Sequence, residues 1–251
     1  MSNAVWKTLP AVPSSLDVPR QLLRVIAPGM TVLDVGCGEA GAAADIQAAG
    51  AEYVGLDCNW PSLARAAQKA REHASRTERL RGGGAIRVVL GEGERLPFRS
   101  ACFDVVLLRA VLTVLPSLDA CRQVLGEALR VSRIAVCTRD FLQTWDDPYY
   151  AARYRAGEAE TGERGAFLVR EGDAVLYRAR HFTSAELFGL MRSVGGETFD
   201  VEVEPVRTRS GKTVQGICLL CRYRAWPIFS STLRQPGLDA RAKASSKRSR
   251  G

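Results

Sequence analysis

Two acidic residues and a cluster of glycines, placed at the ends of short apolar runs, are the residues of this chain whose spacing could bind a ligand. The first run, residues 31–35, contains Asp34. Gly36, Cys37 and Gly38 follow it directly, and glycines let the backbone turn sharply and let a ligand lie against the main chain. The Asp34 carboxylate would repel a pyrophosphate but could attract an ammonium group. We therefore expect a cationic ligand here, although a tight strand-to-helix turn without a ligand would use the same residues.

A second acidic strand end supports the ligand hypothesis. Residues 53–57, Tyr-Val-Gly-Leu-Asp, predict a strand that ends in Asp57. Asp57 lies about 20 residues beyond Gly36, which is the separation at which a carboxylate binds ribose hydroxyls in dinucleotide-binding folds. Cys58 and Asn59 come next, with Asn59 as the expected cap of a long helix. We expect both of these residues to face the same ligand.

Two later stretches complete an ordered set of motifs. Residues 90–98 read Leu-Gly-Glu-Gly-Glu-Arg-Leu-Pro-Phe, and the apolar run at residues 103–108 follows. With the two acidic strand ends, this set resembles the class I S-adenosylmethionine-dependent methyltransferases, most closely the group that includes ubiquinone and menaquinone biosynthesis methyltransferases. The resemblance covers about residues 30–140. One departure is that the family's third glycine falls at Ala40, with Gly41 one place later.

The resemblance implies S-adenosylmethionine as the cofactor. It places Glu92 where the family has an acid that accepts a hydrogen bond from the adenine amino group, and Gly93 where a backbone N–H meets a ring nitrogen. Glu92 could equally belong to an acidic surface turn. Arg109 ends its strand at the binding edge. The full set of expected cofactor-binding residues is Asp34, Gly36, Cys37, Gly38, Asp57, Cys58, Asn59, Glu92, Gly93 and Arg109.

The expected fold is α/β: a Rossmann-like, doubly wound, seven-stranded sheet, mostly parallel, with helices on both faces. Thr183 and Glu186 have the spacing of a capping box at the start of an amphipathic helix. Strands at about residues 198–208 and 213–223 flank a Ser-Gly-Lys turn and predict an antiparallel hairpin that closes the sheet.

The chain of 251 residues suits one methyltransferase domain, expected over residues 1–237. Within it, residues 139–182 are irregular and rich in aromatic residues, arginines and acids, and we expect them to form a substrate-lid insertion. Residues 238–251 form a basic tail, expected to be disordered, which contributes half of the formal net charge of +8. A solubilising role for this tail is favoured over nucleic-acid binding.

Tyr150 and His181 are the catalytic candidates, and with Tyr149 they are expected to line an acceptor pocket. The inserted segment follows the fifth strand, whose carboxyl end opens onto the same edge as the glycine turn. We expect His181 to titrate near neutrality and so to be able to accept a proton from an acceptor hydroxyl or amine. The tyrosines could instead pack the lid, and His181 could simply end a hairpin. Trp6 could close over the ligand, although packing on the domain is the favoured interpretation.

Composition limits the other classes of protein. The longest apolar run, near residues 105–115, is interrupted by Arg109 and is too short to span a bilayer, so a cytoplasmic enzyme with no membrane span is expected. Of the seven cysteines, only Cys218 and Cys221 have C-x-x-C spacing. Because Cys37, Cys102, Cys137 and Cys218 lie within or beside predicted strands, as small buried apolar residues do, no disulfide and no metal site is expected.

The expected reaction is transfer of the sulfonium methyl to a small-molecule acceptor by in-line displacement, in which alignment inside a dry site supplies most of the acceleration. A methyltransferase that acts on tRNA or another RNA is the alternative. It rests on the basic tail and on residues 177–182, Tyr-Arg-Ala-Arg-His-Phe. An alternative of another class is a catalytically silent, cofactor-binding partner subunit. Oligomeric state does not follow from the sequence.

Overall fold

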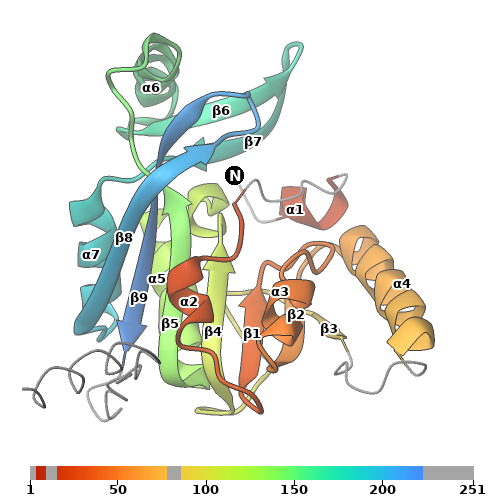
Figure 1. Ribbon diagram of the computed structural model, residues 1–251. Coiled ribbons are helices and arrows are strands. Elements are labelled where there is room, and N and C mark those ends of the chain that lie inside the picture. Colours follow the sequence, from red (N-terminus) through yellow and green to blue (C-terminus); the bar gives the residue numbers. More distant parts are fainter. Residues whose placement is uncertain (1–3, 10–15, 78–85, 223–251) are drawn as a thin grey trace, which may run out of the picture.

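The computed structural model describes residues 4–9, 16–77 and 86–222 (Figure 1). The predictions for the tail at residues 238–251 therefore lie outside the described residues. A seven-stranded sheet forms the centre of the molecule. Its strands are β1 (Thr31–Val35), β2 (Glu52–Asp57), β3 (Arg87–Leu90), β4 (Phe103–Arg109), β5 (Ser132–Phe141), β8 (Thr198–Arg207) and β9 (Thr213–Arg222).

The strand order in this sheet is β3-β2-β1-β4-β5-β9-β8. The five strands from β3 to β5 are parallel to one another, whereas β9 runs antiparallel to both of its neighbours. The sequence order reverses between β1 and β4, which is where doubly wound folds bind their ligands. The Rossmann-like fold and its C-terminal antiparallel hairpin are confirmed.

The central strands are apolar along their length because both faces of the sheet are covered. Successive side chains of a strand point to opposite faces. In β1, accordingly, Val32 packs into the core on one face, whereas Leu33 and Val35 pack into the core on the other. β4 divides in the same way, with Val105 on the first face and Val106 on the second.

Helices cover both faces (Figure 1). One core contains residues of α2 (Arg20–Leu23), α3 (Ala43–Ala48) and α4 (Trp60–Thr77), and the other contains residues of α5 (Leu118–Val131) and α7 (Ser184–Ser193). A short helix, α1 (Ala4–Thr8), contacts α4, and a 3₁₀ turn, η1 (Leu112–Val114), precedes α5. The predicted capping box of Thr183 and Glu186 is present at the start of α7. No helix in the described part of the chain combines the length and apolar character that a membrane crossing requires.

The segment between β5 and α7 lies above the carboxyl ends of the parallel strands (Figure 1). It consists of α6 (Pro148–Thr161) and a two-stranded antiparallel sheet of β6 (Ala166–Glu171) and β7 (Ala174–Arg180). This insertion shares a third apolar core with the ends of β5, β8 and β9. The buried residues of that core are Leu16, Phe141, Tyr150, Tyr154, Phe167, Ala179, Val206 and Val214.

Gly157 allows α6 to approach β6 closely. A Cβ at this position would lie 2.0 Å from the carbonyl oxygen of Ala166, and backbone cannot withdraw as a flexible side chain can. We expect Gly157→Ala to destabilise the protein by about 1–3 kcal/mol through overpacking, with the loss measured by urea unfolding.

The matched control is Gly189→Ala. Gly189 also lies inside a helix, α7, but it is exposed and has no neighbour within 4 Å of the Cβ position. Alanine should raise stability there by roughly 0.5–1 kcal/mol, because it has the higher helix propensity. Equal effects of the two substitutions would contradict the close approach of α6 and β6.

Candidate active site

The turn after β1 has left-handed backbone at every second residue. The φ angles are 70° at Gly36, 54° at Gly38 and 59° at Ala40. Ala40 therefore keeps the backbone conformation that a glycine adopts freely, so the missing third glycine leaves the shape of the turn unchanged. At Gly36 a side chain is excluded for a second reason, because its Cβ would lie 2.6 Å from a methyl group of Val111.

The end of β2 holds this turn in place. The backbone N–H groups of Gly36 and Cys37 both donate to the Leu56 carbonyl, at 2.8 and 3.1 Å. Asp57 accepts hydrogen bonds from the N–H groups of Gly38 and Asn59, each at 2.8 Å. Burial raises the pKa of Asp57, and these backbone hydrogen bonds oppose the rise. The carboxyl group is thus oriented by the backbone, and its remaining lone pairs can accept ligand hydroxyls.

Asp34 lies elsewhere than expected. Its side chain is only 1% exposed and does not line the cavity at the sheet edge. It accepts a hydrogen bond from the Tyr53 hydroxyl at 2.9 Å and lies 3.5 Å from Nη2 of Arg109. Burial raises the pKa of Asp34, and the Arg109 charge and the Tyr53 hydroxyl oppose the rise. Asp34 is thus placed to hold Arg109, and its attraction of a ligand ammonium group, directly or through water, stays a prediction.

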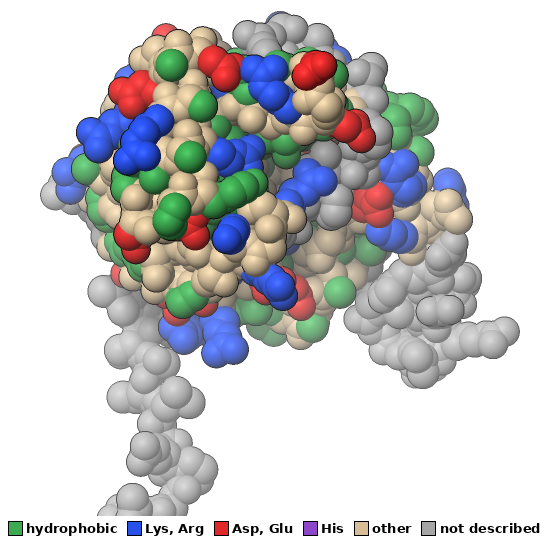
Figure 2. Space-filling view, turned by 90° about the horizontal axis from the view of Figure 1, so that it is seen from above, with side chains coloured by type: hydrophobic (Ala, Val, Ile, Leu, Met, Phe, Trp, Pro, Cys, Tyr) green, Lys and Arg blue, Asp and Glu red, His purple; other side chains and the backbone are tan. Residues whose placement is uncertain are grey.

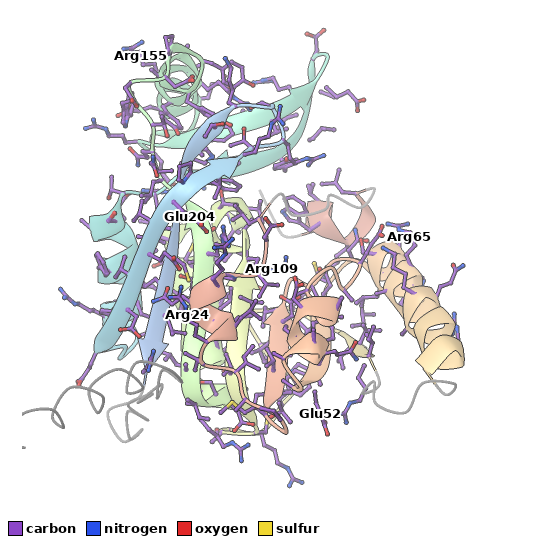
Figure 3. The ribbon with its side chains drawn as sticks, in the orientation of Figure 1. Arg24, Glu52, Arg65, Arg109, Arg155 and Glu204 are labelled. Carbon is purple, nitrogen blue, oxygen red and sulfur yellow. The ribbon has the colours of Figure 1, made fainter. Side chains whose placement is uncertain are left out.

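Arg109 ends β4 near the centre of the molecule, where Figure 3 labels it. Its guanidinium donates to the Leu16 carbonyl at 2.9 Å and lines the cavity, and its side chain is 9% exposed. A buried cation with a buried counter-ion on one side can face a ligand carboxylate on the other.

A cavity of about 1010 Å³ opens at the carboxyl edge of the sheet. Figure 2 looks down on this end of the molecule and shows Lys and Arg side chains near a hollowed region. The volume is at the upper end of the roughly 300–1,000 Å³ that is usual for small-molecule sites, which allows two ligands to lie together. Nine of the ten expected cofactor residues line the cavity, namely Gly36, Cys37, Gly38, Asp57, Cys58, Asn59, Glu92, Gly93 and Arg109.

The N-terminal segment forms one wall of the cavity. Asn59 caps α4 by accepting from the Ser62 N–H at 2.8 Å, and its amide donates to the carbonyls of Trp6 and Leu9 at 2.6 and 2.8 Å. Trp6 lines the cavity, and its ring centre lies 4.8 Å from that of Tyr177 in β7. Trp6 thus packs on the insertion at the cavity wall, and its closure over a ligand stays a prediction.

Glu92 pairs with Lys7 of α1 at 2.5 Å, and both side chains are about half exposed. Exposed ion pairs of this kind contribute little to stability, so a ligand amino group could displace Lys7 at small cost.

The insertion forms an aromatic wall opposite the glycine turn. Tyr150 is 3% exposed and His181 is 4% exposed, and both line the cavity. The Tyr150 hydroxyl lies 3.1 Å from Oγ of Ser210 in the β8–β9 turn. The aromatic residues on this side of the cavity are Phe141, Tyr149, Tyr150, Phe167, Tyr177 and His181.

His181 does not titrate near neutrality, so that expectation is wrong. Burial and the positive charge of Arg153 lower its pKa to about 3. Its Nδ1 lies 2.7 Å from the Tyr154 hydroxyl, and its ring stacks on Phe141 with ring centres 5.2 Å apart. At neutral pH the imidazole is therefore an uncharged hydrogen-bonding group and a weak base.

The basic stretch at residues 177–182 does not form a free phosphate-binding surface. Arg178 and Arg180 are 12% and 9% exposed, and both form ion pairs with Glu163. Arg180 also pairs with Glu186 of the capping box. These arginines tie β7 to neighbouring segments, which removes one of the two observations behind the RNA alternative.

Sequence reasoning missed Arg153 and Arg209, which also line the cavity. Arg153 lies four residues after Tyr149, and this spacing places both side chains on the same face of α6. Because Tyr149 is expected in the acceptor pocket, this spacing could have predicted that Arg153 lines the same pocket. Arg209 lies in the β8–β9 turn, and nothing local in the sequence places this turn beside the cavity.

Comparison with known proteins points to one family. The family model described as "Methyltransferase domain" matches residues 33–134. A demethylmenaquinone methyltransferase from Parafrankia sp. (strain EAN1pec) is 36% identical over 123 residues, which cover 45% of this chain and 47% of the relative. A nocamycin O-methyltransferase from Saccharothrix syringae is 34% identical over 108 residues, or 41% of this chain and 36% of the relative. The chain thus spans less than half the length of each of these relatives.

Solved structures extend the likeness to most of the chain. A SAM-dependent methyltransferase from Methanosarcina mazei has a TM-score of 0.76 and 25% identity, with 82% of this chain and 98% of that chain covered. A magnesium protoporphyrin IX methyltransferase from Synechocystis PCC 6803, solved with bound SAH, has a TM-score of 0.54 and 16% identity. The match covers 80% of this chain and 78% of that chain, and it shows a common fold. Residues 33–134 thus match the methyltransferase domain family, and the ordered motifs, the glycine turn and these likenesses together support a class I S-adenosylmethionine-dependent methyltransferase.

Proposed function

We propose that this protein transfers the sulfonium methyl group of S-adenosylmethionine to a small-molecule acceptor by in-line displacement. One observation carries the proposal: a single continuous cavity is lined both by the cofactor residues at the strand ends and by the aromatic wall of the insertion. Cofactor and acceptor can thus meet in one enclosed space, and alignment in such a space is the main requirement of this reaction.

The residues at the strand ends suit the cofactor. Asp57, oriented by two backbone N–H groups, is placed to accept hydrogen bonds from ribose hydroxyls. The backbone at Gly38 is open, with no atom within 4 Å of the Cβ position. Glu92 and Gly93 line the part of the cavity assigned to adenine, and Arg109 offers a cation to the amino-acid carboxylate. When bound, the cofactor supplies a methyl group already activated by its sulfonium charge.

Residues 139–182 act in this proposal as the acceptor lid of a single domain. The aromatic side chains of α6, β6 and β7 exclude water from the space above the glycine turn, which strengthens the electrostatic interactions inside it. Tyr150 offers its hydroxyl beside Ser210, and His181 offers an uncharged imidazole. Both residues position the methyl acceptor. Neither has to remove a proton when the methyl acceptor is already ionised as it binds.

A product assay tests the proposed function. Purified protein is incubated with methyl-labelled S-adenosylmethionine and, separately, with small-molecule and RNA fractions of a cell extract. We expect label in a small product together with an equal amount of S-adenosylhomocysteine. Label in the RNA fraction would establish the RNA alternative. Cofactor binding without S-adenosylhomocysteine in any fraction would establish the silent partner subunit.

Asp57→Ala should weaken binding of S-adenosylhomocysteine about ten- to 150-fold, because charged hydrogen bonds to ribose contribute roughly 1.5–3 kcal/mol. Calorimetry on folded protein, with folding checked by thermal unfolding, measures the change. Glu52→Ala is the control, because Glu52 is an exposed acid at the opposite end of the same strand, where it pairs with Arg87 (Figure 3). Unchanged affinity in Asp57→Ala would remove Asp57 from the site.

The lowered pKa of His181 predicts a pH dependence of stability. The unfolded chain binds a proton below about pH 6.5, whereas the folded protein binds it only near pH 3. Stability is therefore lost as pH falls through this window. Between pH 7 and pH 5 the wild type should lose roughly 2 kcal/mol more than His181→Asn, measured by urea unfolding. Parallel losses in the two proteins would show that His181 is not held neutral.

A further inference from the structure

Charge is divided unevenly along the cavity. Of the carboxylates that line it, Glu39, Asp57, Glu92 and Glu94 follow or end the first three strands, at the cofactor end, and Glu171 lies at the exposed tip of the β6–β7 hairpin. Three lining cations have a carboxylate partner: Arg109 has Asp34, Lys69 has Glu39, and Arg170 has Glu160. Within the described residues, Arg153 and Arg209 of the acceptor end have no carboxylate within 4.0 Å.

Arg153 is built into the aromatic wall. Its guanidinium carbon lies 4.3 Å from the ring centre of Phe167 and 5.3 Å from that of Tyr149. The guanidinium donates to the Tyr149 hydroxyl at 2.8 Å and to the Leu168 carbonyl at 3.4 Å. These two hydrogen bonds use two of its five N–H donors. The ring contacts and hydrogen bonds fix the cation in position while neutralising none of its charge.

Arg209 adds a second positive charge from the β8–β9 turn. It is exposed and donates to the Tyr177 hydroxyl at 3.3 Å. Arg153, unlike Arg209, is half-buried. A half-buried cation without a counter-ion attracts an anion more strongly than the same cation in water, because the surroundings screen it less. The acceptor end of the cavity thus combines flat apolar walls with net positive charge.

We propose that the acceptor is a planar aromatic anion and that Arg153 is the residue that binds its negative group. This inference rests on the proposed methyl transfer and names the substrate class of that site. The rings of Tyr149 and Tyr177, the more exposed aromatic residues of the cavity wall, supply surfaces for stacking. The guanidinium of Arg153 supplies the charged fork that a carboxylate or phenolate oxygen requires. A carboxylic acid or an acidic phenol has already given its proton to water at neutral pH. Transfer of the methyl group to its oxygen would then form one C–O bond and break the sulfonium C–S bond, without a proton transfer to the uncharged His181.

The test uses three two-ring probes of similar size: naphthoate, its neutral amide, and the saturated decalin carboxylate. Each is titrated by calorimetry into full-length protein saturated with S-adenosylhomocysteine. In the wild type, naphthoate should bind about tenfold or more tightly than the amide, because a charge-assisted hydrogen bond is worth at least about 1.5 kcal/mol. Naphthoate should also bind more tightly than the non-planar decalin carboxylate, because only the planar ring stacks on the aromatic wall.

Arg153→Met should abolish the preference for naphthoate over the amide and leave the affinity for S-adenosylhomocysteine unchanged. Arg155→Met is the matched control, because Arg155 is an exposed arginine of the same helix and does not line the cavity. Figure 3 labels Arg155 beside α6. Arg153→Lys keeps the charge without the planar fork, so it should retain part of the preference. This variant decides the question if Arg153→Met does not fold.

Three results would overturn the proposal. They are a wild type that binds naphthoate no better than the amide, an Arg153→Lys or Arg153→Met protein with an unchanged preference, and an equal loss of preference in Arg155→Met. Binding of S-adenosylhomocysteine shows whether only the proposed substrate class is wrong or the proposed methyl transfer as well. A wild type that binds S-adenosylhomocysteine but does not discriminate among the probes refutes only the substrate class, whereas one that does not bind S-adenosylhomocysteine refutes the methyltransferase proposal itself.

Discussion

The buried ion pair of Asp34 and Arg109 is the interaction on which the binding edge depends. It joins β1 to β4, the two strands at which the sequence order of the sheet reverses. Each buried charge costs several kcal/mol to remove from water, and the cost is offset only while the partner is present. With Asp34 behind it and the Leu16 carbonyl beside it, Arg109 is held at the cavity wall as a charged group. The glycine turn after β1 is held in turn by the Leu56 carbonyl and the Asp57 carboxylate at the end of β2.

The cavity has opposite electrostatic character at its two ends. The strand ends present carboxylates, which suit a cofactor that carries a sulfonium and an ammonium group. The insertion presents aromatic rings and the unneutralised charge of Arg153, which suit an anion. The same division disfavours binding of either ligand in the other's place. Burial is the main cause of the low pKa of His181, and the charge of Arg153 lowers this pKa further.

The family model covers one end of the cavity. It matches residues 33–134, which include β1 to β4 and the cofactor end of the cavity. The residues of the aromatic wall and Arg153 lie outside that match, in the insertion and at the end of β5. Because a fold does not by itself fix a substrate, the acceptor has to be argued from the residues at that end of the cavity.

The sequence alone determined the features that neighbouring residues control. These are the glycine turn, the apolar strands, the capping box of α7 and the C-terminal hairpin, because each depends on backbone preference or on periodicity within a few residues. Only the tertiary structure decided the burial and the charge environment of single side chains. Tyr53 and Arg109 contact Asp34, and Tyr150 and Phe167 help to bury His181 beside Arg153, from positions well separated from them along the chain. Burial and charge depend on which distant segments pack together, and no local pattern of residues records that.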